Sequence, residues 1–466
     1  MSMTIYQKME KRIPKKLMRM VRAISVEADS VGMNAFLVGG FVRDVLLGVR
    51  NYDLDLVIEG DAIEFGRRLK KKINGNLVVH ERFGTATLVK GWPAWLGPSL
   101  HPDNKFKIDI ATARKEKYEK PAALPVVKFS SLRQDLYRRD FTINAMAIKI
   151  NRADFGLFAD YFGGMKDLKN GVIRTLHDKS FLDDPTRIFR AVRFEQRFGF
   201  KIDKHTECLI QHAVKQEMFR RTQNQRIRDE IILMLKEKNP ENAVYRMKEL
   251  HELKFIHPAL SLKRSARKMF QEAEKCIGWY NSHASKPRHL DTWLINFLII
   301  IEGLNAEDTS EVLDKFVFTG GANKKILSYK NSEKAVRRIL ASRKRTPPSI
   351  VYRELEPLAH EATLCVMAKT SSSKIRNRIK KFFTTYNDIT LKIKGNDIQD
   401  EGVSPGPKYK EILEQVLCEK LDGKLLTRRD ELRYMRGIIN VGAGSPRPKG
   451  KGRGNRARTF GERITT

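Results

Sequence analysis

The sequence predicts an α+β protein, in which a mixed sheet with helices comes first and an all-helical region follows. The stretches Asp53–Glu59 and Lys105–Ile110 alternate polar and apolar residues, which is the period of a half-buried strand. From Asp183 to about residue 440 apolar residues recur at helical spacing, as in the stripe that contains Ile188 and Val192. The chain has 466 residues, which is long for one domain, so we expect two or three.

Shorter patterns complete the expected N-terminal sheet. Ala35–Val38 reads as a buried strand, and the stretch from Val42 to Leu47 reads as a helix that ends at Gly48. Residues 76–90 predict a hairpin that turns near Phe83-Gly84. An antiparallel component is therefore expected beside the helices.

The charge balance predicts a polyanionic partner. The chain carries 89 Lys and Arg against 55 Asp and Glu, a formal net charge of +34. Nucleic acid is the first candidate for this partner and an anionic membrane surface the second. Hydrophobic residues make up 41% of the chain, which is enough for real cores and excludes a disordered basic protein.

The four cysteines and the apolar runs favour a reducing, intracellular compartment. The cysteines are scattered without a CxxC pair, which argues against both a disulfide framework and a thiolate zinc site. The basic N-terminus has no apolar core of a signal peptide, and the longest apolar run, Trp293–Ile301, is too short to span a bilayer. We expect a soluble cytoplasmic protein with no membrane partner.

Carboxylates mark the two alternating stretches. Asp53 and Asp55 are two residues apart on one strand, so both side chains leave the same face, and Asp109 follows the same logic on the second stretch. Neighbouring carboxylates repel each other unless a cation joins them, and Mg²⁺ prefers such oxygen ligands. Three carboxylates on neighbouring strands would hold two metals for phosphoryl transfer. For a lone pair of this kind, a solvated strand face is the commoner explanation.

A glycine turn lies upstream of the first carboxylate strand. Gly39 and Gly40 stand between a strand and a helix, where the backbone can approach a ligand closely. The helix start favours anions, and Arg43 can pair with phosphate oxygens. Taken alone, this is equally a tight turn with Arg43 in a surface ion pair. Close to the carboxylates, it suggests a triphosphate cradle beside its metals.

The segment from Leu37 to Gly60 resembles the signature of the class II tRNA nucleotidyltransferase and bacterial poly(A) polymerase family, a branch of the polymerase-β-like nucleotidyltransferases. The matching pattern is LVGGxVRDxLLG followed by DxD. The resemblance implies that Asp53 and Asp55 bind catalytic Mg²⁺, and strand alternation adds Asp109 as the third catalytic carboxylate. It also implies that Gly39, Gly40 and Arg43 contact the phosphates of the incoming nucleotide.

Two further motifs continue the resemblance. Arg138–Ala147 is similar to the second family motif, which assigns Arg139, Asp140 and Asn144 to the phosphates and sugar of the nucleotide. From the residues alone, the arginines precede an apolar helix that Asp140 could cap. Asp183–Phe194 resembles the template motif, in which Asp184 and Arg187 would read the base.

The residues of the template-like helix can also be explained by local structure alone. Asp184 is a plausible N-cap with Pro185 at the first helical position, and this is compatible with base reading. Arg187, Arg190 and Arg193 recur at spacing three, which predicts a cationic ridge for triphosphate or RNA. A solvated helix face is the alternative.

The loop Ala113–Pro125 resembles the flexible loop that the family needs to add the terminal A. The sequence Pro121-Ala122-Ala123 stands where the family often has Gly, which predicts a stiffer hinge. Motifs between Gly395 and Gly423 resemble the tRNA-binding tail domain of the family. The basic C-terminus resembles the cationic tails of some bacterial poly(A) polymerases.

We therefore expect a polymerase-β-like head followed by all-α neck, body and tail domains. The expected segments are a basic N-terminal helix (1–32), the catalytic head (33–165), a neck (166–240), a body (241–394), a tail (395–440) and a disordered basic end (441–466). In the basic end, the expected RNA-binding residues are Arg447, Lys449, Lys451 and Arg453.

The predicted function is template-independent addition of A or CCA to the 3′ end of tRNA. It would use two Mg²⁺ ions, with ATP, and CTP in the CCA case, as substrates. The nearest rival is a poly(A) polymerase acting on other RNA 3′ ends. A non-catalytic RNA-binding protein is the rival from another class, and binding alone would need none of the carboxylates. The sequence makes no prediction of oligomeric state.

Overall fold

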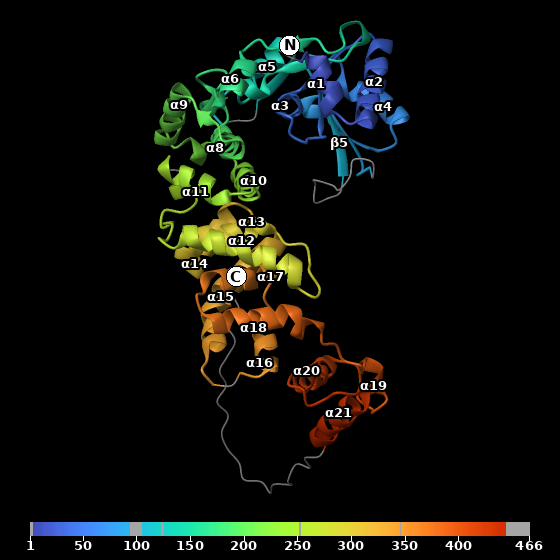
Figure 1. Cartoon of the computed structure of the whole chain (residues 1–466), viewed down its shortest axis with the longest axis vertical. Helices are drawn as coiled ribbons and strands as arrows, with labels where there is room; N and C mark the ends of the chain where they lie inside the picture. Colours follow the sequence, from blue (N-terminus) through green and yellow to red (C-terminus); the bar gives the residue numbers. More distant parts are fainter. Residues whose placement is uncertain (1–2, 94–104, 123–124, 251–252, 345, 444–466) are drawn as a thin grey trace, which may run out of the picture. The chain divides into compact units, whose positions relative to one another are not determined.

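The computed structural model describes residues 3–93, 105–122, 125–250, 253–344 and 346–443 (Figure 1). The chain divides into two compact units. The first unit comprises Met1–Ala273 and Asp291–Lys330, and the second comprises Glu274–Leu290 and Asn331–Thr466. Each unit is described below by itself.

The first unit contains a seven-stranded mixed sheet with the strand order β3-β4-β5-β2-β1-β8-β9. β2 and β5 are parallel neighbours, and the other five adjacent pairs are antiparallel. The strands are β1 (Asn34–Val38), β2 (Leu54–Glu59), β3 (Asn76–His80), β4 (Thr85–Gly91), β5 (Lys105–Thr112), β8 (Ala147–Lys149) and β9 (Phe158–Ala159). This architecture confirms the predicted α+β class with its antiparallel component.

The sequence patterns locate these elements closely. Both alternating stretches are strands, β2 and β5, with their apolar residues buried. Helix α3 (Gly39–Leu47) ends at Gly48, whose φ of +76° lies in the left-handed region that favours glycine. The predicted hairpin is β3 and β4, joined through Gly84. The apolar helix expected after Arg139 is wrong, because that segment forms a 3-10 turn (Thr142–Asn144) before β8.

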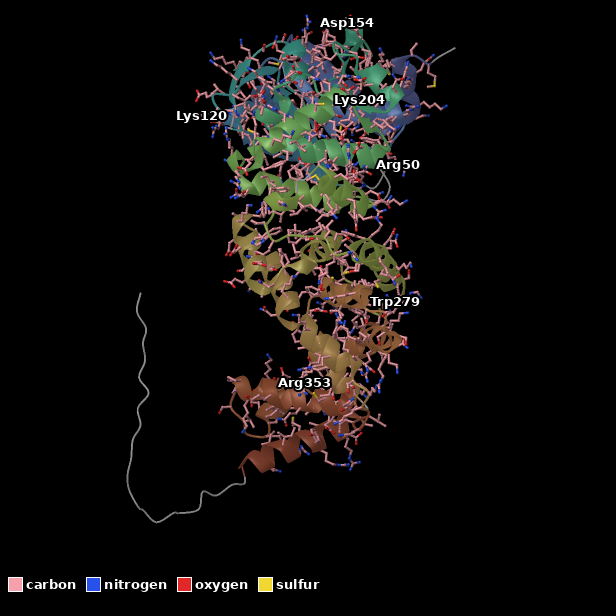
Figure 2. The ribbon with its side chains drawn as sticks, turned by 90° about the vertical axis from the view of Figure 1, so that its left-hand side faces the viewer. Arg50, Lys120, Asp154, Lys204, Trp279 and Arg353 are labelled. Carbon is pink, nitrogen blue, oxygen red and sulfur yellow. The ribbon has the colours of Figure 1, made fainter. Side chains whose placement is uncertain are left out.

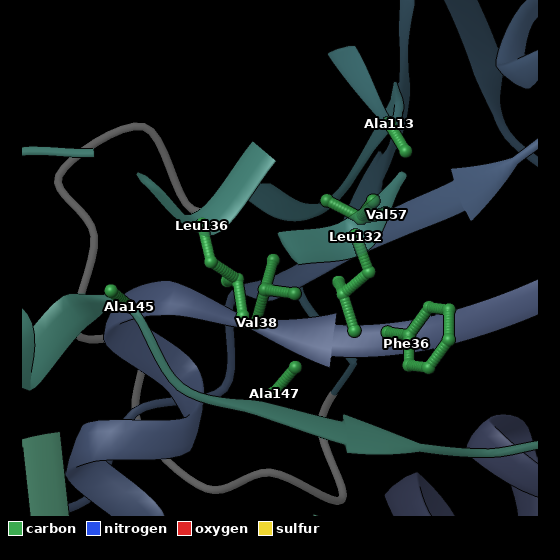
Figure 3. Close-up of a cluster of buried hydrophobic side chains, with 8 residues drawn as sticks. All are labelled: Phe36, Val38, Val57, Ala113, Leu132, Leu136, Ala145 and Ala147. Carbon is green, nitrogen blue, oxygen red and sulfur yellow. The ribbon is translucent and has the colours of Figure 1, made fainter. Parts of the chain in front are cut away.

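A buried cluster fastens the short helix α5 (Leu132–Tyr137) to the sheet (Figure 3). Leu132 and Leu136 lie one helical turn apart and face Val38 of β1 and Val57 of β2, and the other members are Phe36, Ala113, Ala145 and Ala147. Replacing such a buried Leu by Ala typically costs about 2–5 kcal/mol. The packing matters for the site because Arg138, Arg139 and Asp140 follow α5 directly.

Helices make up most of the rest of the first unit. They are α1 (Ile5–Arg12), α2 (Lys15–Ser30), α4 (Ala62–Lys72), α6 (Gly164–Asn170), α7 (Ser180–Asp183), α8 (Thr186–Phe198), α9 (Lys204–Lys215), α10 (Asn224–Leu235), α11 (Pro240–Glu249), α13 (Thr292–Ile300) and α14 (Ala306–Lys315). Two small strand pairs, β6 (Arg114–Lys117) with β7 (Val126–Phe129) and β10 (Val172–Ile173) with β11 (Lys201–Ile202), complete it. The predicted apolar stripe on α8 is buried, as Ile188 and Val192 are 0% exposed.

The described part of the second unit is helical. Its helices are α16 (Pro348–Leu355), α17 (His360–Lys369), α18 (Ser373–Thr384), α19 (Gly395–Gln399), α20 (Pro407–Leu421) and α21 (Arg428–Ala443), and α12 (Ala266–His283) and α15 (Gly320–Ala341) run into it from the first unit. Ile398, Val416 and Met435 centre a core that joins α19, α20 and α21. Exposed arginines and lysines occur on both units, for example Arg50 and Arg353 (Figure 2).

None of the helices in the described ranges combines the length and the apolar composition that crossing a membrane requires.

Candidate active site

Two carboxylates face each other across the parallel strands at the centre of the sheet. Asp55 of β2 is the register partner of Asp109 of β5, and Asp53 precedes β2 by one residue. Burial raises the pKa of Asp55 to about 6; nearby Arg139 opposes this rise, while Asp109 and Asp53 add to it. The three carboxylates are thus close enough to repel one another. The predicted arrangement on neighbouring strands is observed.

Asp109 has a further partner on the adjacent strand. The hydroxyl of Thr87 on β4 donates a hydrogen bond of 2.6 Å to Oδ1 of Asp109. Among the described residues, no three His, Cys, Asp or Glu side chains form a cluster that could hold a metal ion by themselves. Asp53 and Asp55 line one cavity, described below, and Asp109 lines a smaller cavity that adjoins it.

The glycine turn brings backbone against these carboxylates. Gly39 has a φ of +66°, and a Cβ atom there would lie 2.8 Å from Nη1 of Arg139 and 3.5 Å from Oδ2 of Asp55. The backbone conformation disfavours a side chain, and the guanidinium of Arg139 would have to move to make room for a Cβ atom. Gly39 thereby allows Arg139 to approach Asp55 where α3 begins.

Arg43 is held inside the protein rather than on its surface. It is 4% exposed, and its guanidinium donates hydrogen bonds to Asp44 (2.8 Å) and to Oδ1 of Asn144 (2.6 Å). The rings of Phe194 and Phe198 lie 5.0 and 4.7 Å from its Cζ atom. The alternative of a surface ion pair is wrong, since Arg43 joins α3 to the second motif.

Asp135 on α5 orients both arginines of the second motif. Its side chain is 0% exposed and accepts hydrogen bonds from Arg138 (2.6 Å) and Arg139 (3.1 Å). Burial alone would raise the pKa of Asp135, but the two arginines hold it below its ordinary value. Arg139 is thereby directed from α5 toward Asp55.

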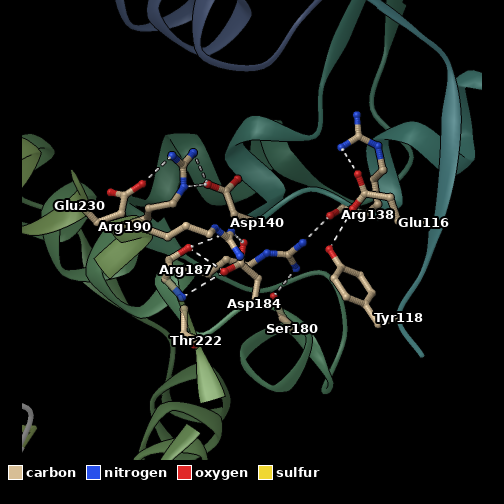
Figure 4. Close-up of polar contacts among 12 residues, drawn as sticks. Glu116, Tyr118, Arg138, Asp140, Ser180, Asp184, Arg187, Arg190, Thr222 and Glu230 are labelled. Carbon is tan, nitrogen blue, oxygen red and sulfur yellow. Dashed lines mark hydrogen bonds and ion pairs between the residues drawn. The ribbon is translucent and has the colours of Figure 1, made fainter. Parts of the chain in front are cut away.

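Asp140 joins the second motif to α8 (Figure 4). Its Oδ2 pairs with Arg190 at 2.7 Å, and its Oδ1 accepts from Asn144 at 2.9 Å. Its pKa falls to about 2 because Arg190 and Asn144 outweigh the effect of burial. Asp140 caps no α-helix, so the capping alternative is wrong, although it accepts from the backbone N–H of Phe141.

Two arginines of α8 share one acid of α10. Arg190 and Arg193 each lie 3.5 Å from Glu230. Arg187 and Arg193 are only 6% and 7% exposed, so the alternative of a solvated helix face is wrong. The ridge is real, but Arg187 and Arg193 are buried, and Glu230 partly neutralises Arg190 and Arg193.

The two template-like residues have structural partners as well (Figure 4). Arg187 donates from Nη1 to Ser180 Oγ (2.8 Å) and from Nη2 to the backbone carbonyl of Arg138 (2.7 Å). Asp184 pairs with Arg226 at 2.7 Å and accepts from the backbone N–H of Thr186 at 3.1 Å. The expected N-cap role of Asp184 is wrong, because Pro185 occupies the N-cap position of α8 and the helix begins at Thr186.

One cavity of about 750 Å³ gathers these side chains. It is lined by twelve of the thirteen site residues predicted before the C-terminus, namely Gly39, Gly40, Arg43, Asp53, Asp55, Arg139, Asp140, Asn144, Asp184, Arg187, Arg190 and Arg193. Asp109 lines an adjoining cavity of about 290 Å³ that shares Asp55 and Arg139. The predicted RNA-binding residues Arg447, Lys449, Lys451 and Arg453 lie outside the described residues.

The main cavity contains nine arginines against six carboxylates, which suits a polyanionic ligand. Several lining residues were not predicted: Arg114, Glu116, Tyr118, Arg138, Arg226 and Glu230. The acids among them pair with arginines that are distant in the sequence, as Glu230 does with Arg190. The resemblance of Ala113–Pro125 to the flexible loop of the family was a signal for Arg114, Glu116 and Tyr118, and the basic pair Arg138-Arg139 was a signal for Arg138.

Family comparisons match two segments of the chain. Residues 35–174 match the model of the Poly A polymerase head domain. Residues 199–263 match the model described as "Probable RNA and SrmB- binding site of polymerase A". The first match contains the carboxylates and the second motif, and the second begins just after α8.

Similar proteins extend the match over most of the chain. The A-adding tRNA nucleotidyltransferase of Geobacter sulfurreducens is 37% identical over 91% of this chain, which spans only 47% of that relative. The protein of the same name from Halalkalibacterium halodurans is 30% identical, and the match covers 91% of this chain and 93% of the relative. The chain thus spans about half the length of the first relative and nearly all of the second.

Solved structures share this fold. The Thermotoga maritima CCA-adding enzyme complexed with tRNA superimposes with a TM-score of 0.69 at 34% identity, covering 94% of this chain and 99% of that one. A CCA-adding enzyme in complex with ATP superimposes with a TM-score of 0.71 at 34% identity, covering 96% and 98%.

Proposed function

Because the chain belongs to the class II tRNA nucleotidyltransferase and bacterial poly(A) polymerase family, we propose that it transfers nucleotides from ATP to the 3′ end of tRNA. The observation that carries this proposal is the pairing of Asp55 with Asp109 beside an arginine-lined cavity. A protein that only bound RNA would gain nothing from carboxylates, since they repel phosphate. Product release as pyrophosphate follows from attack of an RNA 3′-OH on the α-phosphate of a nucleoside triphosphate.

The cavity supplies distinct groups for each part of the nucleotide. The arginines around Gly39, above all Arg139, are suited to the triphosphate because guanidinium groups bind phosphate oxygens in pairs. Asn144 and Asp140 line the same cavity, and a sugar hydroxyl could replace the one hydrogen bond between them. Asp184 and Arg187 offer an acceptor edge and a donor edge to the base.

Asp53 and Asp55 are the residues that would hold Mg²⁺. Mg²⁺ in such sites is bound through one or two carboxylates together with substrate phosphates, so a cage made only of protein groups is not required. The raised pKa of Asp55 fits this assignment, because a cation would relieve the repulsion among Asp53, Asp55 and Asp109. When bound, the ions would activate the 3′-OH and stabilise the leaving pyrophosphate.

tRNA is the proposed acceptor, and addition of A or of CCA is the proposed reaction. The named relatives support both versions, since two are A-adding and the two structures are CCA-adding enzymes. Their tRNA and ATP complexes support the same acceptor and nucleotide here. The match of residues 199–263 supports an RNA contact on the helices after α8.

An extension assay with Mg²⁺ tests this proposal. The acceptors are tRNA transcripts ending at the discriminator base, at C or at CC, and an unrelated RNA, with ATP and CTP supplied separately and together. Addition of a single A to the CC-ended tRNA alone identifies an A-adding enzyme, whereas two C followed by one A identifies a CCA-adding enzyme. Long A tracts on the unrelated RNA would identify a poly(A) polymerase instead. No incorporation on any acceptor would refute nucleotidyl transfer.

A further inference from the structure

A second cavity, of about 560 Å³, lies in the first unit away from the candidate active site. It is formed by residues after α9, the start of α10, the segment around Phe255 and the end of α14 (elements labelled in Figure 1). It shares no lining residue with the cavity that contains Asp53 and Asp55. Its volume is within the range of small-molecule sites, roughly 300–1,000 Å³.

Cations outnumber acids on its wall. Arg220, Lys254 and Lys315 line it together with a single carboxylate, Glu217. Glu217 pairs with Arg220 at 2.9 Å, so this pair is balanced. Lys254 has no hydrogen bond or ion pair with any other residue in the described ranges, and Lys315 donates to backbone carbonyls of Phe255 and Ile256 rather than to an acid. Two positive charges therefore remain without an acidic partner.

Arg220 lies close enough to Lys315 to affect its charge state. The pKa of Lys315 falls below its ordinary value because of burial and, secondly, because Arg220 is near. An ammonium has three donors, and the carbonyls of Phe255 and Ile256 use at most two of them. A bound anion would accept the remaining proton and relieve the repulsion, since charge-assisted hydrogen bonds are among the strongest.

An aromatic floor lies beside the cations. The rings of Phe219 and Phe255 are 4.9 Å apart at an angle of 31°, and both line the cavity. Phe219 is fixed in the core at 5% exposure, whereas Phe255 is only partly buried. The partly buried ring of Phe255, which also packs against Phe189, is the one suited to stacking on a planar ligand, and such stacking is worth about 1–3 kcal/mol for a nucleobase.

One polar side chain and two strained residues lie on or near the wall of this cavity. The side-chain amide of Asn224 also lines the cavity and makes no hydrogen bond to another described residue. Glu217 has a φ of +52° and Val317, two residues beyond Lys315, a φ of +50°. For residues other than glycine this conformation costs about 1–3 kcal/mol and tends to persist at binding sites.

We propose that this cavity binds a nucleotide, with its phosphate on Arg220, Lys254 and Lys315 and its base on Phe219 and Phe255. A purely apolar ligand would leave the cations unused, and a bare anion would leave the aromatic rings unused. A free mononucleotide and an unpaired nucleotide of a bound RNA present the same chemistry here. The inference does not rest on the proposed transfer reaction, because the cavity is separate from the carboxylates.

Photocrosslinking with peptide mapping tests the inference on the full-length protein. One arm uses 8-azido-ATP and the other a single-stranded RNA that carries 4-thiouridine. We expect crosslinks on peptides that contain Phe219 or Phe255, competed by AMP. Crosslinks there from 8-azido-ATP identify a free nucleotide as ligand, and crosslinks there from the RNA alone identify an RNA nucleotide. Crosslinks from both probes confined to peptides of the Asp53 cavity would overturn the proposal.

The variant Lys254→Glu places repulsion at the phosphate without disturbing the core, since Lys254 is exposed and unpaired within the described chain. We expect crosslinking at Phe219 or Phe255 to fall by about tenfold or more. Lys248→Glu is the matched control, because Lys248 on α11 is exposed and does not line the cavity. An equal loss of crosslinking in the two variants would show a general charge effect and overturn the proposed site. An inactive protein that still crosslinks here would refute only the transfer reaction.

Discussion

Arg187 donates a hydrogen bond of 2.7 Å to the backbone carbonyl of Arg138, which lies 49 positions earlier in the chain. The side chain of Arg138 is held in turn by Asp135 (2.6 Å) and by Glu116 (3.1 Å). Tyr118 donates to the second oxygen of Glu116 at 2.8 Å. The proposed base reader on α8 is therefore connected to the loop Ala113–Pro125 through one residue of the second motif.

This connection predicts that Glu116 positions the base-reading edge. Replacing Glu116 by Gln keeps its shape but removes the charge that holds Arg138, so Arg187 loses part of its support. We expect kcat/KM for ATP on a CC-ended tRNA to fall by about tenfold, which is the effect of weakening one charge-assisted hydrogen bond. Steady-state kinetics with ATP and CTP measure the change.

Glu119→Gln is the control for this substitution, because Glu119 lies on the same loop and is exposed. A positioning role changes the ratio of ATP to CTP use, whereas a merely structural loss lowers the use of both equally. An unchanged ratio in Glu116→Gln, or the same change in Glu119→Gln, would contradict the role assigned to Glu116.

Asp53→Ala is expected to abolish nucleotide incorporation while tRNA binding persists. Asp53 lines the main cavity beside Asp55, and its loss leaves a single carboxylate there for a divalent ion. Incorporation and filter binding measured on the same preparation separate the two effects. Asp154→Asn, an exposed substitution in the same unit, serves as control (Figure 2). Transfer at the wild-type rate by Asp53→Ala would remove the metal assignment.

Asp55→Asn is expected to raise thermal stability at pH 7 while it abolishes activity. The charged form of Asp55 is disfavoured in the folded protein, where its pKa is about 6 against 3.8 for the ordinary group. The amide is never charged, so the gain in stability over wild type is largest above pH 6. The gain shrinks as the pH falls toward 3.8, because below that value wild-type Asp55 is protonated in both the folded and the unfolded state. Melting curves of both proteins in metal-free buffer between pH 4 and 8 measure it. A variant that is less stable than wild type at pH 7 would contradict the burial of this charge.

Ala122 occupies a backbone conformation that favours glycine. Its φ is +60°, it is 7% exposed, and its N–H donates to the backbone carbonyl of Leu182 at 2.9 Å. We expect Ala122→Gly to leave the stability within about 1 kcal/mol of wild type, since relief of strain is offset by the greater freedom of glycine in the unfolded chain. Ala122→Val should lose at least about 1 kcal/mol, because a β-branched residue fits this region worst.

The loop variants also test the stiff hinge that the sequence predicts. If the hinge limits loop movement, Ala122→Gly increases the rate of A addition to a CC-ended tRNA and leaves tRNA affinity unchanged. Single-turnover rates and binding constants measure the two quantities. A decrease in that rate would show that the ordered conformation of Ala122, rather than its freedom, serves the reaction.

The carboxylate strands could be predicted because their signal is local. Alternation alone placed Asp55 and Asp109 on exposed faces of two strands, since the side-chain period of a strand is two. The parallel register that makes them direct partners joins residues 54 positions apart, and no local pattern encodes it. It follows from the packing of the sheet, including the cluster around Val57 and Leu136.

The burial of Arg187 and Arg193 on α8 could not be predicted, because it too depends on residues distant in the sequence. Spacing indicated that Arg187, Arg190 and Arg193 share one face, but their acidic partners lie on other elements, such as Asp140 and Glu230. A charge run of this kind is usually solvated, so a solvated face was a reasonable alternative. Only the tertiary arrangement shows that the ridge lines a cavity.

Removal of residues 442–466 is expected to weaken RNA binding and to reduce its dependence on salt. This segment contains seven Lys and Arg residues and one Glu, so each cation that contacts a phosphate in the complex releases counterions. The slope of log K against log salt should become shallower by about 0.7 for each lost contact with single-stranded RNA. Binding of tRNA and of an unrelated RNA is measured between 50 and 200 mM salt, roughly the range over which such contacts are resolved. Equal losses for both RNAs indicate contacts without sequence preference, whereas an unchanged slope would show that the segment serves another purpose.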